Sequence, residues 1–338
     1  MSGLLTDVEH LIDHADWMNV EGQPIEAITV LGDVLDQLSS EPPSELQSRA
    51  LRGVGLAFRS LGDVNESALA YEEALEVSRA CGSNIEQAEA LNGLAIAAQL
   101  KGELDLADSW YAAAAELALH EGLFQLTGII EQNRGVIASD LGDFAGARKR
   151  YKTALSAFHT AGDIIGGCWT LNNLGLLSAE AGHVLEAMQF FDQAQDYAGQ
   201  ADNRALGVRV EINRANVLIG VEDWEGARDR LETAIAVART TAMPQLVAEG
   251  LRYLAKAERR AGRPWNALSR VRQAMETAGA VPDTLLLAEA QREAGACWVA
   301  LGDTDRAREA WEDAAGRFEE VGATHDHAHV TELLADLV

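Results

Sequence analysis

The sequence lacks the features that mark secreted and membrane-spanning proteins. Among its 338 residues, no apolar run approaches the roughly 20 residues that a membrane span needs. The first residues lack the basic start and apolar core of a secretory signal. The only cysteines, Cys81, Cys168 and Cys297, are widely spaced without a Cys-x-x-Cys pair, which argues against disulfides or a zinc site and favours buried small side chains. We therefore expect a soluble cytoplasmic protein with no membrane partner.

Positive charge is also scarce. Lysine and arginine number 27 against 53 aspartates and glutamates, so the formal net charge is -26. Such a chain repels nucleic acid and anionic lipid, because both are bound through cationic contacts. We expect no nucleic-acid partner. Arginine greatly outnumbers lysine, which hints at a GC-rich bacterial genome.

Signatures of catalysis are missing as well. The chain has no Gly-x-x-x-x-Gly-Lys-Ser/Thr phosphate loop, no His-Glu-x-x-His and no Gly-x-Ser-x-Gly. The pair Gly53 and Gly55 falls within a predicted helix rather than after a strand. We therefore expect neither an enzyme nor a cofactor.

Two histidine clusters are the candidates for metal binding. His10 and His14 lie four residues apart near the start, and His325, His327 and His329 lie near the end. A metal site needs three or four converging ligands and a second shell that orients them. The preferred interpretation is a solvated helix face, and a metal site is the alternative.

Glycine and the six prolines follow one frame of 40 residues. Turn residues recur at this spacing: Gly22, Gly62, Gly102, Gly142, Gly182, Glu222, Gly262 and Gly302. A second set of breakers lies midway between them: Pro42, Gly82, Gly122, Gly162, Asp202, Ala242, Pro282 and, after the last turn, Gly322. Two breaks per 40 residues predict two helices per repeat. The aspartate that follows several turns is a predicted helix cap, and Asp63 with Glu66 has the spacing of a capping box.

Small and large side chains keep fixed places in this frame. Five residues after each turn the side chain is small: Ala27, Ser67, Ala107, Ala147, Ala187, Ala227, Ala267 and Ala307. Nine residues after the turn it is large: Leu31, Tyr71, Tyr111, Tyr151, Phe191, Leu231, Val271 and Trp311. Small side chains let two helix backbones approach closely, and the large one fills the space that they leave.

This order of small, turn, alanine and aromatic residues resembles the tetratricopeptide repeat, and it spans residues 4 to 322. Segments such as Leu171-Asn-Asn-Leu-Gly-Leu-Leu and Leu61-Gly-Asp resemble the 40-residue variant of kinesin light chains, Leu-Gly-Asn adaptors and bacterial regulators. The commoner unit has 34 residues and a closing proline that is absent here, so its superhelical pitch does not transfer. The resemblance implies an all-α, right-handed α-solenoid. It divides residues 1–324 into eight helical hairpins (about 4–40, 44–81, 84–121, 124–161, 164–201, 204–241, 244–281 and 284–322), and residues 325–338 form a C-terminal capping helix.

The resemblance also implies that the first helix of each repeat lines a concave groove. The groove positions hold a series of side-chain amides: Asn92, Gln132, Asn133, Asn172, Asn173, Asn213 and Asn216. An amide donates and accepts, which suits the backbone of an extended peptide. Asparagine is a poor helix former, so its recurrence on one helical face calls for a reason. The alternative is that these amides bond to one another within the solenoid.

Aromatic and cationic residues share these groove positions. Trp169 and Tyr253 are the aromatic ones. The cations are Arg52, Arg209, Arg252 and Lys256, together with Arg49, Arg59, Arg259 and Arg292. They favour a partner with carboxylates. The alternative is that they balance groove glutamates such as Glu89 and Glu249.

Two acid–base pairs hold matching positions two repeats apart. Glu131 with Arg134 and Glu211 with Arg214 stand where other repeats have leucine. Structural ion pairs are the preferred interpretation, and contacts with a partner at the groove edge are the alternative.

The sequence therefore predicts a scaffold or adaptor that holds an extended segment of another protein or a peptide in its groove. The alternative is a regulator that senses a peptide or other ligand and controls a separate transcription or signalling protein. Self-association through the solenoid ends, giving a homo-oligomer, is a further possibility.

Overall fold

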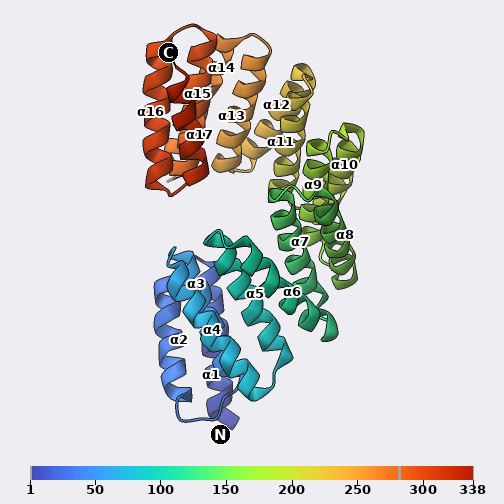
Figure 1. Ribbon diagram of the computed structural model, residues 1–338, viewed down its shortest axis with the longest axis vertical. Helices are drawn as coiled ribbons and strands as arrows, with labels where there is room; N and C mark the ends of the chain where they lie inside the picture. The colour runs from blue at the N-terminus through green and yellow to red at the C-terminus, as the bar shows by residue number, and fades with distance from the viewer. Residues whose placement is uncertain (1, 281–282, 338) are drawn as a thin grey trace. The chain divides into compact units, whose positions relative to one another are not determined.

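The computed structural model describes residues 2–280 and 283–337, with side chains from residue 7 onward, and every regular element in them is an α-helix (Figure 1). The helices are α1 (Ser2–Val20), α2 (Pro24–Leu38), α3 (Glu45–Ser60), α4 (Val64–Cys81), α5 (Asn84–Leu100), α6 (Leu104–His120), α7 (Phe124–Asp140), α8 (Phe144–Ala161), α9 (Ile164–Glu180), α10 (Val184–Gln200), α11 (Arg204–Gly220), α12 (Trp224–Thr240), α13 (Pro244–Arg260), α14 (Pro264–Gly279), α15 (Thr284–Ala300), α16 (Thr304–Glu320) and α17 (Thr324–Ala335). Pro282, where the sequence predicts a break between repeats, lies outside the described residues.

The predicted fold class is confirmed: helical hairpins succeed one another along the chain, each with an odd-numbered and an even-numbered helix. The capping helix is confirmed too. Val330 of α17 is fully buried in a cluster with Trp311 and Phe318, and Leu333 and Leu334 pack against the same cluster. The last hairpin therefore does not expose its apolar face.

Left-handed backbone conformations occur at the predicted turns. Glycine takes a positive φ at most of them, for example +83° at Gly62 and +77° at Gly302. Asp202, Glu222 and Ala242 take the same conformation, with φ of 47°, 65° and 54°. A side chain beyond Cα disfavours this region, so these three successive turns are strained.

Helix capping only partly follows the prediction. Asp143 and Asp303 accept hydrogen bonds from the backbone N–H groups of Gly146 and Arg306, at 2.9 and 3.1 Å. The predicted capping box at Asp63 is wrong, because its side chain makes no capping hydrogen bond. At this helix start the N–H of Val64 instead donates to the carbonyl of Gly62.

Aromatic side chains of the even-numbered helices pack directly on glycines of the odd-numbered ones. A Cβ at Gly93 would lie 2.4 Å from the ring of Tyr71, and one at Gly295 would lie 2.3 Å from the ring of Trp311. Only hydrogen fits there. The small and large positions of the sequence frame therefore meet in space, as the frame predicts.

The chain divides into two compact units, Met1–Gly166 and Gly167–Val338, which we describe separately as unit 1 and unit 2. In each unit odd-numbered helices also contact one another directly, as α1 does with α3, α3 with α5, α11 with α13 and α13 with α15. We call the surface formed by these helices the odd-helix face, and the opposite one the even-helix face.

Candidate functional site

A pocket of about 340 Å³ opens on the odd-helix face of unit 1. Its walls come from α1, α3 and α5, and the ring of Tyr71 reaches it from α4 between Gly55 and Gly93. The two glycines explain why this aromatic ring can extend through the helix layer. We call this cavity the Tyr71 pocket.

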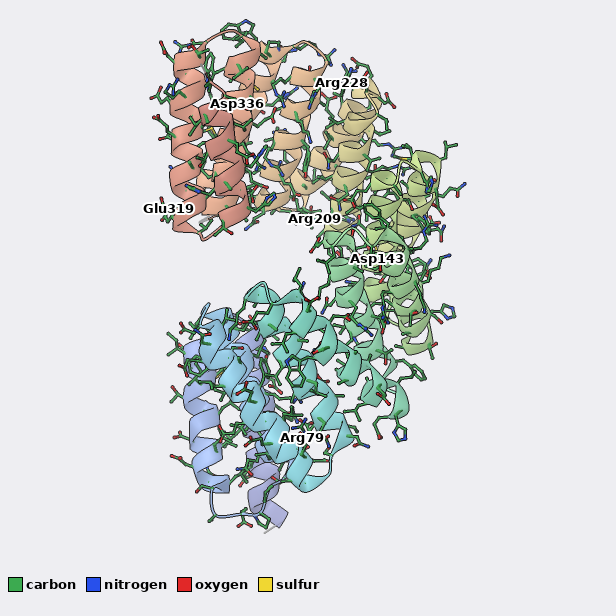
Figure 2. All side chains as sticks on the ribbon, in the orientation of Figure 1. Arg79, Asp143, Arg209, Arg228, Glu319 and Asp336 are labelled. Carbon is green, nitrogen blue, oxygen red and sulfur yellow. The ribbon has the colours of Figure 1, made fainter. Side chains whose placement is uncertain are left out.

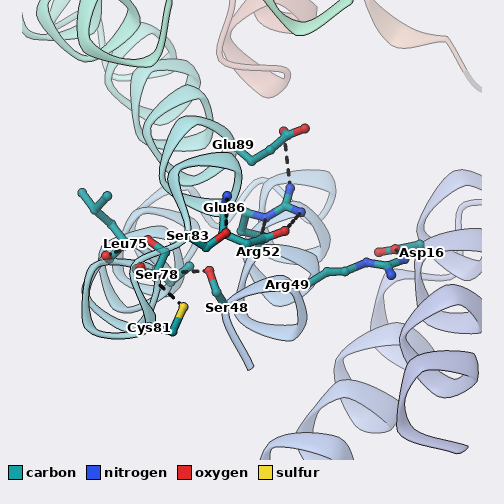
Figure 3. A network of polar contacts seen from close by, with 11 residues as sticks. Asp16, Ser48, Arg49, Arg52, Leu75, Ser78, Cys81, Ser83, Glu86 and Glu89 are labelled. Atoms are coloured by element: carbon teal, nitrogen blue, oxygen red, sulfur yellow. Dashed lines mark hydrogen bonds and ion pairs between the residues drawn. The ribbon is translucent and has the colours of Figure 1, made fainter. Parts of the chain in front are cut away.

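Three arginines of α3 line the Tyr71 pocket, and two of them already have partners. Arg49 binds Asp13 and Asp16, with N–O distances of 2.5 and 2.8 Å. Arg52 binds Glu86 at 2.8 Å and Glu89 at 3.4 Å (Figure 3). Both links join successive odd-numbered helices, so they hold the pocket walls together.

Arg59 is the exception. Among the residues that the structure describes, this half-buried side chain has no hydrogen-bond or ion-pair partner. Its charge lies near Tyr71, where it opposes the rise in the phenol pKa that burial causes. The pocket thus has three cations against the carboxylates of Asp16 and Glu89, with one positive charge left over.

Polar atoms without partners also line the Tyr71 pocket. The Oδ1 atom of Asn92 is buried and accepts no hydrogen bond in the described part of the chain. Such an atom lowers stability unless a donor reaches it. Nearby, burial raises the pKa of Glu89, the charge of Arg52 opposes that rise, and the charge of Glu86 adds to it.

The other predicted amides of unit 1 are engaged within the protein. Asn133 donates from Nδ2 to the hydroxyl of Tyr111 at 3.1 Å, and that hydroxyl donates to Gln99 at 3.0 Å. Burial raises the pKa of Tyr111 to about 12, although the hydrogen bond from Asn133 opposes the rise. Gln132 also has an interaction within the chain. These amides therefore support the fold, which is the alternative that the sequence left open.

In unit 2 the predicted amides bond mainly to one another. Asn213 of α11 donates to Oδ1 of Asn172 of α9 at 3.0 Å, and Asn172, which is only 2% exposed, lies 3.5 Å from Oδ1 of Asn173. Asn216 accepts from Lys256 at 3.1 Å. The Nδ2 atom of Asn173 and the Oδ1 atom of Asn213 keep no partner among the described residues. Two amide groups are thus left to face a ligand.

The cations of the odd-helix face in unit 2 have partners on the next odd-numbered helix. Arg209 binds Glu249 at 2.6 Å, Arg252 binds Glu289 at 3.3 Å and Arg259 binds Glu293 at 2.6 Å. Arg292 binds Asp326 in the same way. The guanidinium of Arg252 also stacks 4.2 Å from the ring centre of Tyr253. These contacts match the interpretation of mutual charge balance, whereas Trp169 is half-buried on α9 without an aromatic partner in the described residues.

The matching acid–base pairs form similar networks in the two units. Glu131 binds Arg134 and Arg150, both at 3.2 Å, and Glu211 binds Arg230 at 2.9 Å. Arg134 reaches Asp108 at 2.7 Å, and Arg214 reaches Asp192 at 2.5 Å. Every one of these partners lies within the chain, which agrees with the structural interpretation.

Tyr71 is the site residue that sequence reasoning missed, because its place in the frame marks it as packing. The signal that could have revealed it is the pair of glycines, Gly55 and Gly93, in successive first helices. Within the described ranges no group of three or more histidine, cysteine, aspartate or glutamate side chains could hold a metal ion. None of the helices described is long and apolar enough to cross a membrane.

No family model matches the sequence, and no curated protein matches it. Solved structures do. The apo form of RapI gives a TM-score of 0.62 at 15% identity and covers 82% of this chain and 99% of its own. A tetratricopeptide repeat protein from Parabacteroides merdae gives 0.61 at 18% identity, with 86% and 99% covered. A Rap protein complexed with Competence and Sporulation Factor gives 0.56 at 12% identity, with 98% and 97% covered. With the 40-residue frame, these matches show that the chain has the fold of the tetratricopeptide-repeat proteins.

Proposed function

We propose that this chain binds a segment of another polypeptide on its odd-helix face and that the Tyr71 pocket anchors this segment. The observation that carries the proposal is the surplus charge of Arg59 beside the unpartnered Oδ1 atom of Asn92. Elsewhere on this face cations are paired within the chain. A group that stays unpaired in such surroundings is a candidate for a ligand.

The chemistry of the pocket suits an acidic residue or a chain end followed by a backbone amide. A ligand carboxylate on Arg59 would form a charge-assisted hydrogen bond, which is among the stronger polar contacts. A backbone N–H of the ligand would satisfy Asn92. The phenol of Tyr71 donates or accepts, so it fits either group.

In unit 2 the same face offers the remaining atoms of Asn173 and Asn213. The predicted role of Arg52, Arg209, Arg252 and Lys256 as direct ligands changes accordingly. Since each already has a partner, a ligand carboxylate would have to displace Glu86, Glu249, Glu289 or Asn216. We propose that these cations orient the groove walls and that the amides contact the ligand.

Two forms of this function remain distinct: an adaptor that holds a protein, and a sensor that responds to a short peptide or other ligand. The similar Rap structure was solved in complex with Competence and Sporulation Factor, which supports the sensor form by analogy of fold. The adaptor form needs no change of shape on binding. The sensor form requires that the ligand bind two states of the protein unequally.

Affinity capture from the lysate of the native cell tests the proposal. The bait is the full chain, compared with the double variant Arg59→Ala, Asn92→Ala and with Arg79→Ala as a control. Arg79 is exposed on the even-numbered helix α4 of the same unit (Figure 2). Proteins and small molecules that co-elute are identified by mass spectrometry.

We expect one ligand to be lost with the double variant and kept with the control. A protein lost in this way establishes the adaptor, and a short peptide or metabolite establishes the sensor. Equal retention by all three baits, with unchanged helicity, would show that the Tyr71 pocket is not the binding site.

A further inference from the structure

Helix α8 differs from the rest of this acidic chain. It carries Arg148, Lys149, Arg150 and Lys152 and contains no aspartate or glutamate, whereas each of the other helices has at least one. The chain as a whole has a net charge of -26. Positive charge is therefore concentrated on one element of unit 1.

This helix forms one wall of a trough of about 820 Å³ on the even-helix face, between α6 and α8, with α7 as its floor. Along α8 the trough is lined at helical spacing by Ala145, Arg148, Lys149, Lys152, Thr153, Ser156 and Thr160. The stripe follows one side of the helix over most of its length, because residues three and four apart share a face. We call this cavity the α6–α8 trough.

The acidic residues of the trough do not neutralise this stripe. Glu131, on the floor, is buried and already binds Arg134 and Arg150. Glu116 of α6 is the only other carboxylate of the lining. Lys149 and Lys152 are exposed and have no ion-pair partner in the described residues. Their charges are thus available to a molecule that enters the trough.

The trough also has an apolar part. Leu119 of α6 is 61% exposed and Phe124 of α7 is 38% exposed, and alanines of α6 continue the wall. Burying such side chains under a partner is favourable by about 25 cal/mol per Å² of apolar area. The surface therefore combines an apolar strip with a line of cations.

A second trough in unit 2 provides the contrast. The space between α14 and α16 has a similar volume, about 830 Å³, and is also lined by three arginines, Arg272, Arg306 and Arg317. There the acids Glu276, Glu309 and Asp313 match them in number. Charge selection for an anionic partner is thus particular to the α6–α8 trough.

We infer that the α6–α8 trough docks an acidic, amphipathic helix or segment of a partner protein, independently of the ligand on the odd-helix face. Its carboxylates face Lys149, Lys152 and Arg148, and its apolar side chains cover Leu119 and Phe124. The negative charge elsewhere on the chain does not prevent this, because salt screens charges beyond about 8 Å at physiological ionic strength. Nucleic acid is a poorer fit, since two unpaired lysines release few counterions and the apolar strip would stay uncovered.

Fluorescence anisotropy tests this docking with a labelled helical peptide of about 15 residues, built of glutamate with leucines at i, i+4, i+7 and i+11. The full chain is compared with Lys149→Glu, Lys152→Glu. The control, Arg79→Glu, Lys101→Glu, changes the net charge equally at exposed sites of the same unit. We expect the trough variant to weaken binding by on the order of tenfold or more, the control to leave it unchanged, and added salt to weaken it.

Three further measurements make the result decisive. Circular dichroism establishes that both variants fold. The Arg59→Ala, Asn92→Ala variant should bind the peptide as the parent does, which separates this inference from the proposed function. Equal loss in the control, or tighter binding of single-stranded DNA or of phosphatidylserine vesicles than of the peptide, would overturn the inference.

Discussion

The odd-helix faces of the two units use similar residues for different ends. In unit 2, Arg209, Arg252 and Arg259 each bind a glutamate of the next odd-numbered helix. In unit 1, Arg52 does the same, but Arg59 stays without a partner beside a buried amide oxygen. The difference teaches that groove cations in a repeat protein serve first as links between neighbouring repeats. Only those left over are candidates for a ligand.

The turns differ between the units in a parallel way. The described left-handed turns of unit 1 are all glycines, from Gly22 to Gly162. Unit 2 has three successive turns at which Asp202, Glu222 and Ala242 take this conformation. Unit 2 thus has more pairing on its face and more strain in its backbone.

The packing that creates the Tyr71 pocket gives the largest expected effect. Gly93→Ala would place a methyl group 2.4 Å from the ring of Tyr71, so we expect the free energy of unfolding to fall by about 1–3 kcal/mol. Gly32→Ala is the matched control, because no atom lies within 4 Å of its added Cβ. That variant should be stabilised by up to about 1 kcal/mol. Urea unfolding followed by circular dichroism measures both, and an equal effect of the two would refute the role of this contact.

The comparison between the faces is tested by deleting one arginine from each. Arg259→Ala leaves the carboxylate of Glu293, which is 12% exposed, without its two hydrogen bonds, at a cost of about 1–3 kcal/mol. Arg59→Ala removes no contact of this kind and should change the free energy of unfolding by less than about 0.5 kcal/mol. Hydrogen exchange of α13 and α15 localises the first effect. A similar loss of stability in both variants would mean that Arg59 has a structural partner.

The strained turns give the smallest expected effect, with opposite signs in the two units. Glu222→Gly removes the side chain from a residue with a φ of 65° and should raise the free energy of unfolding by about 1 kcal/mol. Gly62→Ala imposes the same strain on unit 1 and should lower it by about 1 kcal/mol. Glu222 is exposed and has no ion pair in the described residues, so the change acts through the backbone alone. Thermal and urea unfolding together measure the pair, and the same sign for both would contradict the account.

The sequence predicted most of the fold because its breaks carry a physical requirement. A left-handed turn needs glycine or accepts strain, and Glu222 could be placed by its distance from Gly182 and Gly262. The capping box at Asp63 could not be predicted reliably, since spacing does not decide which acceptor a helix start uses.

The candidate site was less accessible to sequence reasoning. Asn133, Asn172 and Asn213 were placed on the expected helices, yet a residue type does not reveal whether its polar atoms are already bonded. The partners of these amides lie up to 41 residues away along the chain. Tyr71 looked like packing because its hydroxyl and its ring serve different surroundings.

By itself, the sequence determined the repeat, its helices and the pairing of large side chains with glycines, because each of these follows from backbone geometry and steric size at a fixed spacing. Only the tertiary structure decided which charges remain. Ion pairs such as Arg252 with Glu289 form between repeats, where side-chain reach and burial select one partner among several acids. The surplus on Arg59 and along α8 is what this selection leaves.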